Sequence, residues 1–114
     1  IMAYTEVAKV LGAQDSYRLS PEIKRYSLRD VGFVETKGGK FQLERSLDPN
    51  TPFGQAFKLK VVVDASLKKF KLATVTANGL KEVNVFTGKN AEVNVEQLNF
   101  ILADLVAHNI LVKL

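Results

Sequence analysis

Arg25, Tyr26, Arg29 and Asp30 form the most varied group of chemically active side chains in the sequence. They fall in one short segment directly before a predicted strand. Two guanidinium groups beside a phenol and a carboxylate suit a small anionic metabolite, because arginine binds carboxylates and phosphates through paired N–H groups. The plainer interpretation is a structural turn in which Arg29 and Asp30 pair locally, and we prefer it.

A second candidate is a basic sheet face. It consists of Lys58, Lys60, Lys69 and Lys71, which alternate with apolar residues along two adjacent predicted strands, so that lysine lines one face and the core lies on the other. Repulsion between neighbouring lysines would be relieved by an anionic metabolite or an acidic protein partner. A solvated face that discourages aggregation is the preferred interpretation.

Nucleic-acid binding is disfavoured for this face. The neighbouring Phe57 and Phe70 have the opposite parity to the lysines and are expected to face the core. Stacking of bases requires aromatic rings on the same exposed face as the charges.

Most familiar catalytic residue sets are missing. The chain has no cysteine and one histidine, His108, which excludes disulfides, thiolate catalysis, iron–sulfur clusters and Cys/His zinc sites. We expect no cofactor and no metal. His108 falls in the last turn of a predicted helix, where a histidine more often stabilises the helix end than acts as a base. A non-catalytic accessory or metabolite-binding protein is therefore favoured, and the alternative is a small enzyme that uses carboxylate, arginine or lysine chemistry.

Length and composition predict one domain over residues 1–114. A chain of 114 residues, 46% hydrophobic and 25% charged, can bury a core without a disulfide or metal. The net charge of +4 is ordinary for a small domain. We find no apolar run long enough to span a membrane and no signal-peptide pattern, and so expect a cytoplasmic protein without a membrane partner.

The fold class that the pattern predicts is α+β, with antiparallel hairpins in two small sheets packed against a single long C-terminal helix. The expected elements, in chain order, are a strand or helix over 5–11 with strand preferred, a helical turn over 21–25, a hairpin of 31–36 with 40–47, a loop over 48–54, a second hairpin of 57–63 with 70–77, a third meander strand over 81–86, a helix over 95–108 and a final strand over 110–114.

The helix is the clearest single element. Apolar residues recur at spacings of three and four, which places Leu98, Leu102 and Leu105 in the core. Asn94 with Gln97 fits a capping box, and we expect Asn109 to end the helix in a left-handed conformation. The apolar strand that follows must pair inside the fold, be covered, or meet its equivalent in a second copy. Internal pairing is slightly preferred, and a homodimer is the further prediction.

Two segments carry a resemblance to a known family. Arg25-Tyr26-Ser27-Leu28-Arg29-Asp30-Val31-Gly32-Phe33 and Phe41-Gln42-Leu43-Glu44-Arg45-Ser46-Leu47-Asp48-Pro49 resemble a small bacterial family of unknown function that is linked to amino-acid metabolism. The resemblance implies sheets packed on one helix and a remote similarity in fold to prokaryotic S-adenosylmethionine decarboxylases. Those enzymes form a pyruvoyl group by cleavage before a serine that follows glutamate. The sequence contains no Glu-Ser pair, so no catalytic residue is carried over.

Overall fold

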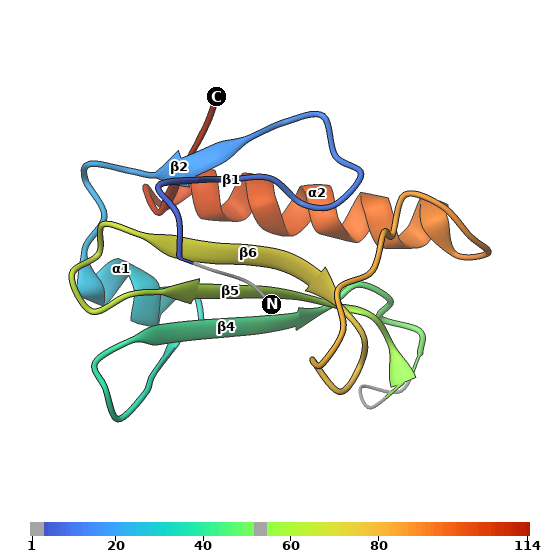
Figure 1. Ribbon diagram of the computed structural model, residues 1–114, viewed down its shortest axis with the longest axis horizontal. Coiled ribbons are helices and arrows are strands. Elements are labelled where there is room, and N and C mark those ends of the chain that lie inside the picture. The colour runs from blue at the N-terminus through green and yellow to red at the C-terminus, as the bar shows by residue number, and fades with distance from the viewer. Residues whose placement is uncertain (1–3, 52–54) are drawn as a thin grey trace.

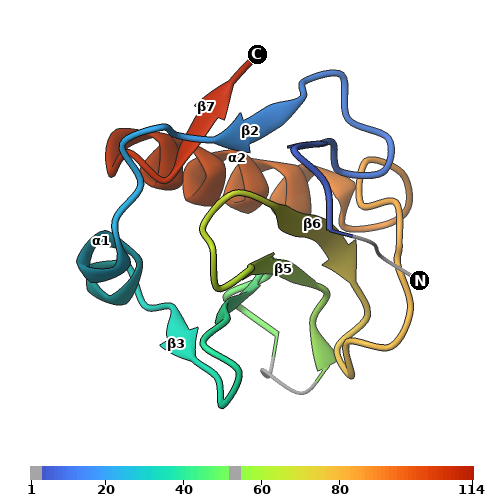
Figure 2. The ribbon, with the colours of Figure 1, turned by 60° about the vertical axis from the view of Figure 1, so that its left-hand side comes forward.

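The computed structural model describes residues 4–51 and 55–114. Its elements in chain order are β1 (Val7–Ala8), β2 (Tyr17–Leu19), α1 (Arg25–Asp30), β3 (Val34–Glu35), β4 (Phe41–Ser46), β5 (Lys58–Val63), β6 (Phe70–Val75), α2 (Ala91–Ala107) and β7 (Leu111–Lys113) (Figure 1). They form two antiparallel sheets with the orders β1-β2-β7 and β3-β4-β5-β6. Helix α2 lies along the β6 side of the larger sheet, with β2 and β7 on its other flank (Figures 1 and 2). The predicted α+β class is confirmed.

The larger sheet contains both predicted hairpins. In its centre Val61 pairs with Leu43 on one side and Leu72 on the other, and all three are buried. Because side chains alternate along a strand, this register turns one apolar row from each of the three long strands toward α2. The first hairpin is shorter than expected, since Val31 ends α1 and β3 retains two residues.

Helix α2 confirms the predicted core and corrects the predicted start. Leu98, Leu102 and Leu105 are buried, and the helix ends before Asn109, which has a φ of 59°. The helix begins at Ala91, so the capping box at Asn94 is wrong. Asn94 lies inside the first turns, where its backbone N–H donates to the carbonyl of Asn90 (3.0 Å).

The N-terminal third differs most from the sequence-based expectation. The strand expected over 5–11 is reduced to β1 and a backbone bridge between Thr5 and Phe70. The helical turn expected over 21–25 is a tight turn in which the Ser20 hydroxyl accepts from the Glu22 N–H (3.1 Å), and the helix follows it as α1. Ser20 and Pro21 are typical of a helix start, but the turn that Ser20 caps ends before α1 begins at Arg25.

The third meander strand, expected over 81–86, is wrong. After the Asn78-Gly79 turn the chain makes one bridge between Val75 and Glu82. The Asn84 side chain then accepts from the Phe86 N–H (2.9 Å) and turns the chain away from the sheet. Gly12 packs against this asparagine, where a Cβ would approach its amide to 2.6 Å, and its φ of +85° is one that glycine adopts without strain.

The second face of the larger sheet is less solvated than predicted. Lys58 is only 6% exposed, and Val62, Ala73 and Val75 on the same face are also buried. Phe57, which the alternation predicts to face the core, is exposed. It precedes the first residue of β5, so the alternation of the strand does not govern it.

The loop expected over 48–54 is confirmed for its first four residues, and residues 52–54 lie outside the described residues. Within the described residues, every helix is too short or too polar to span a bilayer.

Candidate functional site

A cavity of about 600 Å³ lies at the end of the sheet where β4 ends and β5 begins. The residues that line it come from three segments of the chain: Asp48, Thr51, Gln55, Ala56 and Phe57 between the two strands; Val83, Asn84, Thr87, Gly88, Lys89 and Asn90 before α2; and Asn94 in α2. It is large enough for a small metabolite and combines hydrogen-bonding groups with an apolar patch, as binding sites commonly do.

Asp48 supplies a buried carboxylate. The residue is 9% exposed, and its side chain organises the turn after β4. One carboxylate oxygen accepts from the Asn50 N–H (3.0 Å), and the other accepts from the Thr51 hydroxyl (2.7 Å). An ionised carboxylate has about four lone-pair sites, so these two bonds leave acceptor capacity on both oxygens. No ion-pair partner faces Asp48 among the described residues.

Asn94 supplies a buried amide. It occupies the same face of α2 as Leu98 and Leu105, and it is 5% exposed. Its side chain makes no hydrogen bond to another described residue, yet the described chain has no polar side-chain atom that is both fully buried and unpaired. The amide therefore reaches the cavity. A ligand in the cavity can therefore form hydrogen bonds with this amide.

The rest of the wall is divided between polar and apolar groups. Lys89 is the one cation among the described lining residues, and it is exposed on the loop before α2. Phe57 and Val83 form an apolar patch on the same cavity. Asn90 precedes the helix without capping it through its side chain. The cavity thus offers one negative group, one positive group and several neutral hydrogen-bonding side chains.

Sequence reasoning missed this cavity. Its residues lie up to 46 positions apart, from Asp48 to Asn94, and no local motif joins them. One signal was available, because Asn94 occupies an apolar position of the helical pattern four residues before Leu98. The sequence pattern predicts a helix cap at this position instead.

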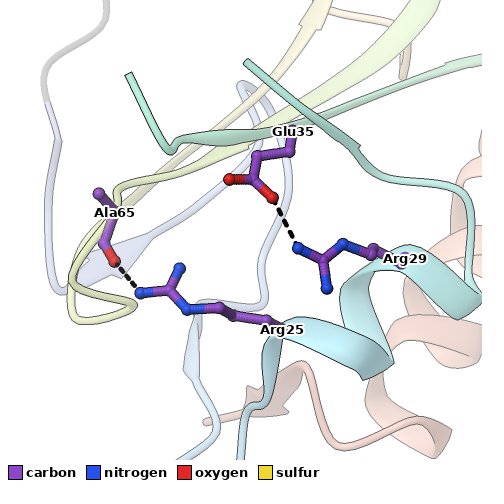
Figure 3. Close-up of polar contacts among 4 residues, drawn as sticks. All are labelled: Arg25, Arg29, Glu35 and Ala65. Atoms are coloured by element: carbon purple, nitrogen blue, oxygen red, sulfur yellow. Dashed lines mark hydrogen bonds and ion pairs between the residues drawn. The ribbon is translucent and has the colours of Figure 1, made fainter. Parts of the chain in front are cut away.

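The structure gives the two predicted arginines partners within the protein (Figure 3). Arg25 donates to the backbone carbonyl of Ala65 (2.9 Å), and Arg29 pairs with Glu35 (2.6 Å). Both guanidinium groups also lie over the ring of Phe41, at 6.0 and 5.5 Å. These contacts fasten α1 to the sheet and favour the structural interpretation.

The other two members of the predicted group do not complete a site with the arginines. Tyr26 is exposed and lies beside a different hollow with Lys24 and Asn109, and Asp30 is exposed at the end of α1. The role of Arg25, Tyr26, Arg29 and Asp30 in ligand binding stays a prediction.

The four lysines of the predicted basic face lie in different environments. Lys58 is buried and pairs with Glu44 across to β4 (3.4 Å), which corrects the expectation that it is solvated. Lys71 lies over the ring of Tyr4 at 4.4 Å, and Lys40 approaches the same ring at 5.2 Å. Lys69 is exposed and Lys60 is half-buried. A role for these lysines in binding an anionic or acidic partner also stays a prediction.

A smaller hollow of about 260 Å³ lies between the β1–β2 connection and α2, where it meets Tyr17, Leu98 and Leu102. Burial raises the pKa of Tyr17, the charge of Lys113 opposes that rise, and the charge of Asp15 adds to it. The phenol is therefore neutral at physiological pH, which makes this hollow a weaker candidate for acid–base chemistry.

Two further features that could support chemistry are His108 and possible clusters of metal-binding side chains. The His108 ring contacts the backbone carbonyl of Asp104 (2.8 Å) at the exposed end of α2, as expected for a helix-end histidine. Within the described ranges, no group of three or more His, Cys, Asp or Glu residues is arranged to hold a metal ion.

The fold and the cavity define a small α+β protein with a ligand-sized hollow at the N-terminal end of its long helix. The model of the family DUF1831, described as "Putative amino acid metabolism", matches residues 2–112, and the chain belongs to this family. A crystal structure at 1.20 Å resolution of a DUF1831 family protein (lp2179) from Lactobacillus plantarum is 46% identical in sequence. The alignment covers 97% of each chain, with a TM-score of 0.89. A search of curated proteins gives no match.

Proposed function

We propose that this protein is a non-catalytic, cytoplasmic accessory protein of amino-acid metabolism that binds a small metabolite in the cavity beside the N-terminal end of α2. The observation that carries the proposal is the Asn94 side chain, which is buried on the cavity wall and has no hydrogen-bond partner among the described residues. The family description supports the metabolic context. The described wall has no histidine, cysteine or serine, and its Thr51 hydroxyl donates to Asp48 within the turn after β4, which supports binding without turnover.

A thermal-shift and calorimetric screen tests the proposal. The panel contains the proteinogenic amino acids, the corresponding 2-oxo acids, and nucleotides. A ligand present at 100 times its dissociation constant stabilises the folded state by about 2.7 kcal/mol, which such a screen detects. We expect at least one member of the panel to stabilise the wild-type protein.

The variant Asn94→Leu then locates the site. It removes the amide and restores an apolar residue at a core position, so the unliganded protein is expected to be at least as stable as wild type. Ligand stabilisation should disappear. The matched control is Asn99→Leu on the same helix, which does not line the large cavity and should leave binding unchanged.

Three results would contradict the proposal: no member of the panel binds, binding survives Asn94→Leu, or the bound compound is converted to product. Conversion would favour the alternative, an enzyme with carboxylate, arginine or lysine chemistry. Proton NMR of the bound compound over several hours distinguishes binding from turnover.

A further inference from the structure

We infer that the cavity selects a zwitterionic α-amino acid with an apolar side chain, with the ammonium group bound at Asp48. This inference rests on the proposed function and specifies the ligand of the same cavity. It is carried by the distribution of charge and polarity on the described wall, where an anion, a cation, neutral amides and an apolar patch are held by separate segments.

Asp48 is the negative group on the described wall. The residue is only 9% exposed and has no cationic partner among the described residues, and burial of an unpaired carboxylate costs desolvation energy that an arriving ammonium group can offset. The acceptor sites that remain beyond Asn50 and Thr51 suit N⁺–H donors. A ligand that is only an anion would be repelled by the same carboxylate.

Lys89 binds the carboxylate of the ligand. It is the positive group on the described wall, and the amides of Asn90 and Asn94 line the same cavity as neutral donors. Asn94 can also rotate its amide to accept a hydrogen bond, so it serves either end of an amino acid. One fixed charge of each sign matches a dipolar ligand of zero net charge.

The apolar part of the wall contacts the side chain of the ligand. Phe57 is partly exposed at the cavity although it is a large aromatic residue, and Val83 and Ala56 lie on the same wall. Covering this patch with an aliphatic or aromatic group removes apolar surface from water. Charged side chains would gain nothing there, because the charged wall groups are already matched by the ligand backbone.

Matched ligand series test the inference by titration calorimetry. The probes are L-leucine, L-methionine and L-phenylalanine, with the 2-oxo acid and the amino acid amide of each skeleton. The 2-oxo acid lacks the ammonium group, and the amide lacks the carboxylate. We expect each amino acid to bind at least about tenfold more tightly than either analogue, since each analogue lacks one of the two charged groups that pair with Asp48 and Lys89.

Two charge variants assign the contacts. Asp48→Asn keeps an acceptor for the Asn50 N–H and should weaken amino acid binding about tenfold while leaving the 2-oxo acid unchanged or tighter. Lys89→Met should weaken the amino acid and the 2-oxo acid but not the amino acid amide. Lys81→Met is the control, because Lys81 is exposed and does not line the cavity.

The outcomes separate this inference from the proposed function. If a 2-oxo acid or nucleotide binds and loses binding in Asn94→Leu, while the three amino acids do not bind, the proposed cavity stands and the zwitterion is wrong. If the amino acids bind with full affinity to Asp48→Asn, the ammonium contact is wrong. If no probe binds, both fail.

Discussion

At the scale of single residues, the most unusual placement is Lys58, a lysine buried on a face that alternation predicts to be solvated. Its ammonium group meets Glu44 at 3.4 Å, and the glutamate side chain is 30% exposed. The cost of burying the lysine is offset by a carboxylate that itself remains partly hydrated. Pairs of this kind contribute little net stability, but removal of one partner leaves a buried charge.

Glu44→Ala should therefore lower the free energy of unfolding by about 1–3 kcal/mol, measured by urea denaturation, because it leaves the Lys58 ammonium without its carboxylate. Lys58→Met keeps the length of the side chain and removes the charge, so it should cost less. The control is Asp15→Ala, which breaks the exposed pair with Lys113 and should cost between zero and about 1 kcal/mol. Equal effects of Glu44→Ala and Asp15→Ala would show that the buried pair contributes no more to the free energy of unfolding than the exposed pair.

At the scale of elements, α2 supplies the apolar stripe that joins the core and also positions Asn94. Leu102 is buried among core residues, whereas Phe100, two positions earlier, is 72% exposed. Two large apolar residues in one helix thus have opposite environments.

Leu102→Ala should lower the free energy of unfolding by about 2–5 kcal/mol, because it removes buried methyl groups and leaves a cavity. Phe100→Ala should change it by no more than about 0.5 kcal/mol, although it deletes a larger side chain. Urea midpoints of the two variants against wild type make the comparison. A negligible shift for Leu102→Ala would contradict the core assignment.

The elements with a clear hydrophobic periodicity could be predicted from the sequence. The elements whose bounds depend on contacts between distant residues could not. The β5–β6 hairpin and the body of α2 have clear alternation or helical spacing, so burial alone specifies them. The start of α2 depends on the loop through Gly88, which has a φ of +97°. The sequence of this loop does not contain a capping box that would mark the helix start. The third meander strand fails because Asn84 bonds its own loop, and a side chain of that length competes with ladder pairing.

The same reasoning explains the outcome at the candidate site. The group around Arg25 can be recognised from the sequence because its members are neighbours in the chain, and the structure gives its arginines partners in the sheet and in a turn. The cavity was not visible because Asp48, Lys89 and Asn94 are brought together only when the end of β4 meets the start of α2. The local sequence feature that points to the cavity is Asn94, a polar residue at an apolar position of the helical pattern.

At the scale of the whole molecule, the remaining prediction is self-association through β7. The strand pairs with β2, which confirms internal pairing for one of its edges, and no described strand lies on the other. Ser20 donates to Ile110 and Leu114 donates to Ser16, both at 2.9 Å. Because hydrogen-bonded pairs alternate in an antiparallel ladder, the backbone groups of Leu111 and Lys113 point toward the open edge.

A two-fold contact along this edge would extend the small sheet into a second copy. Leu111→Lys cannot test it, since Leu111 is part of the buried core and the variant would unfold. Lys113→Pro removes an N–H at the open edge without removing a bond to β2, and Lys113→Ala keeps that N–H while losing the same exposed ion pair with Asp15.

Light scattering should therefore show a mass above the 12.6 kDa of one chain that rises with concentration for wild type and Lys113→Ala, and a constant 12.6 kDa for Lys113→Pro. Backbone pairing carries no net charge, so the association should persist when salt is raised, unlike a contact through Lys60 and Lys69. A wild-type mass of 12.6 kDa at every concentration would exclude the dimer, and the open edge of β7 would then be protected by its short length alone.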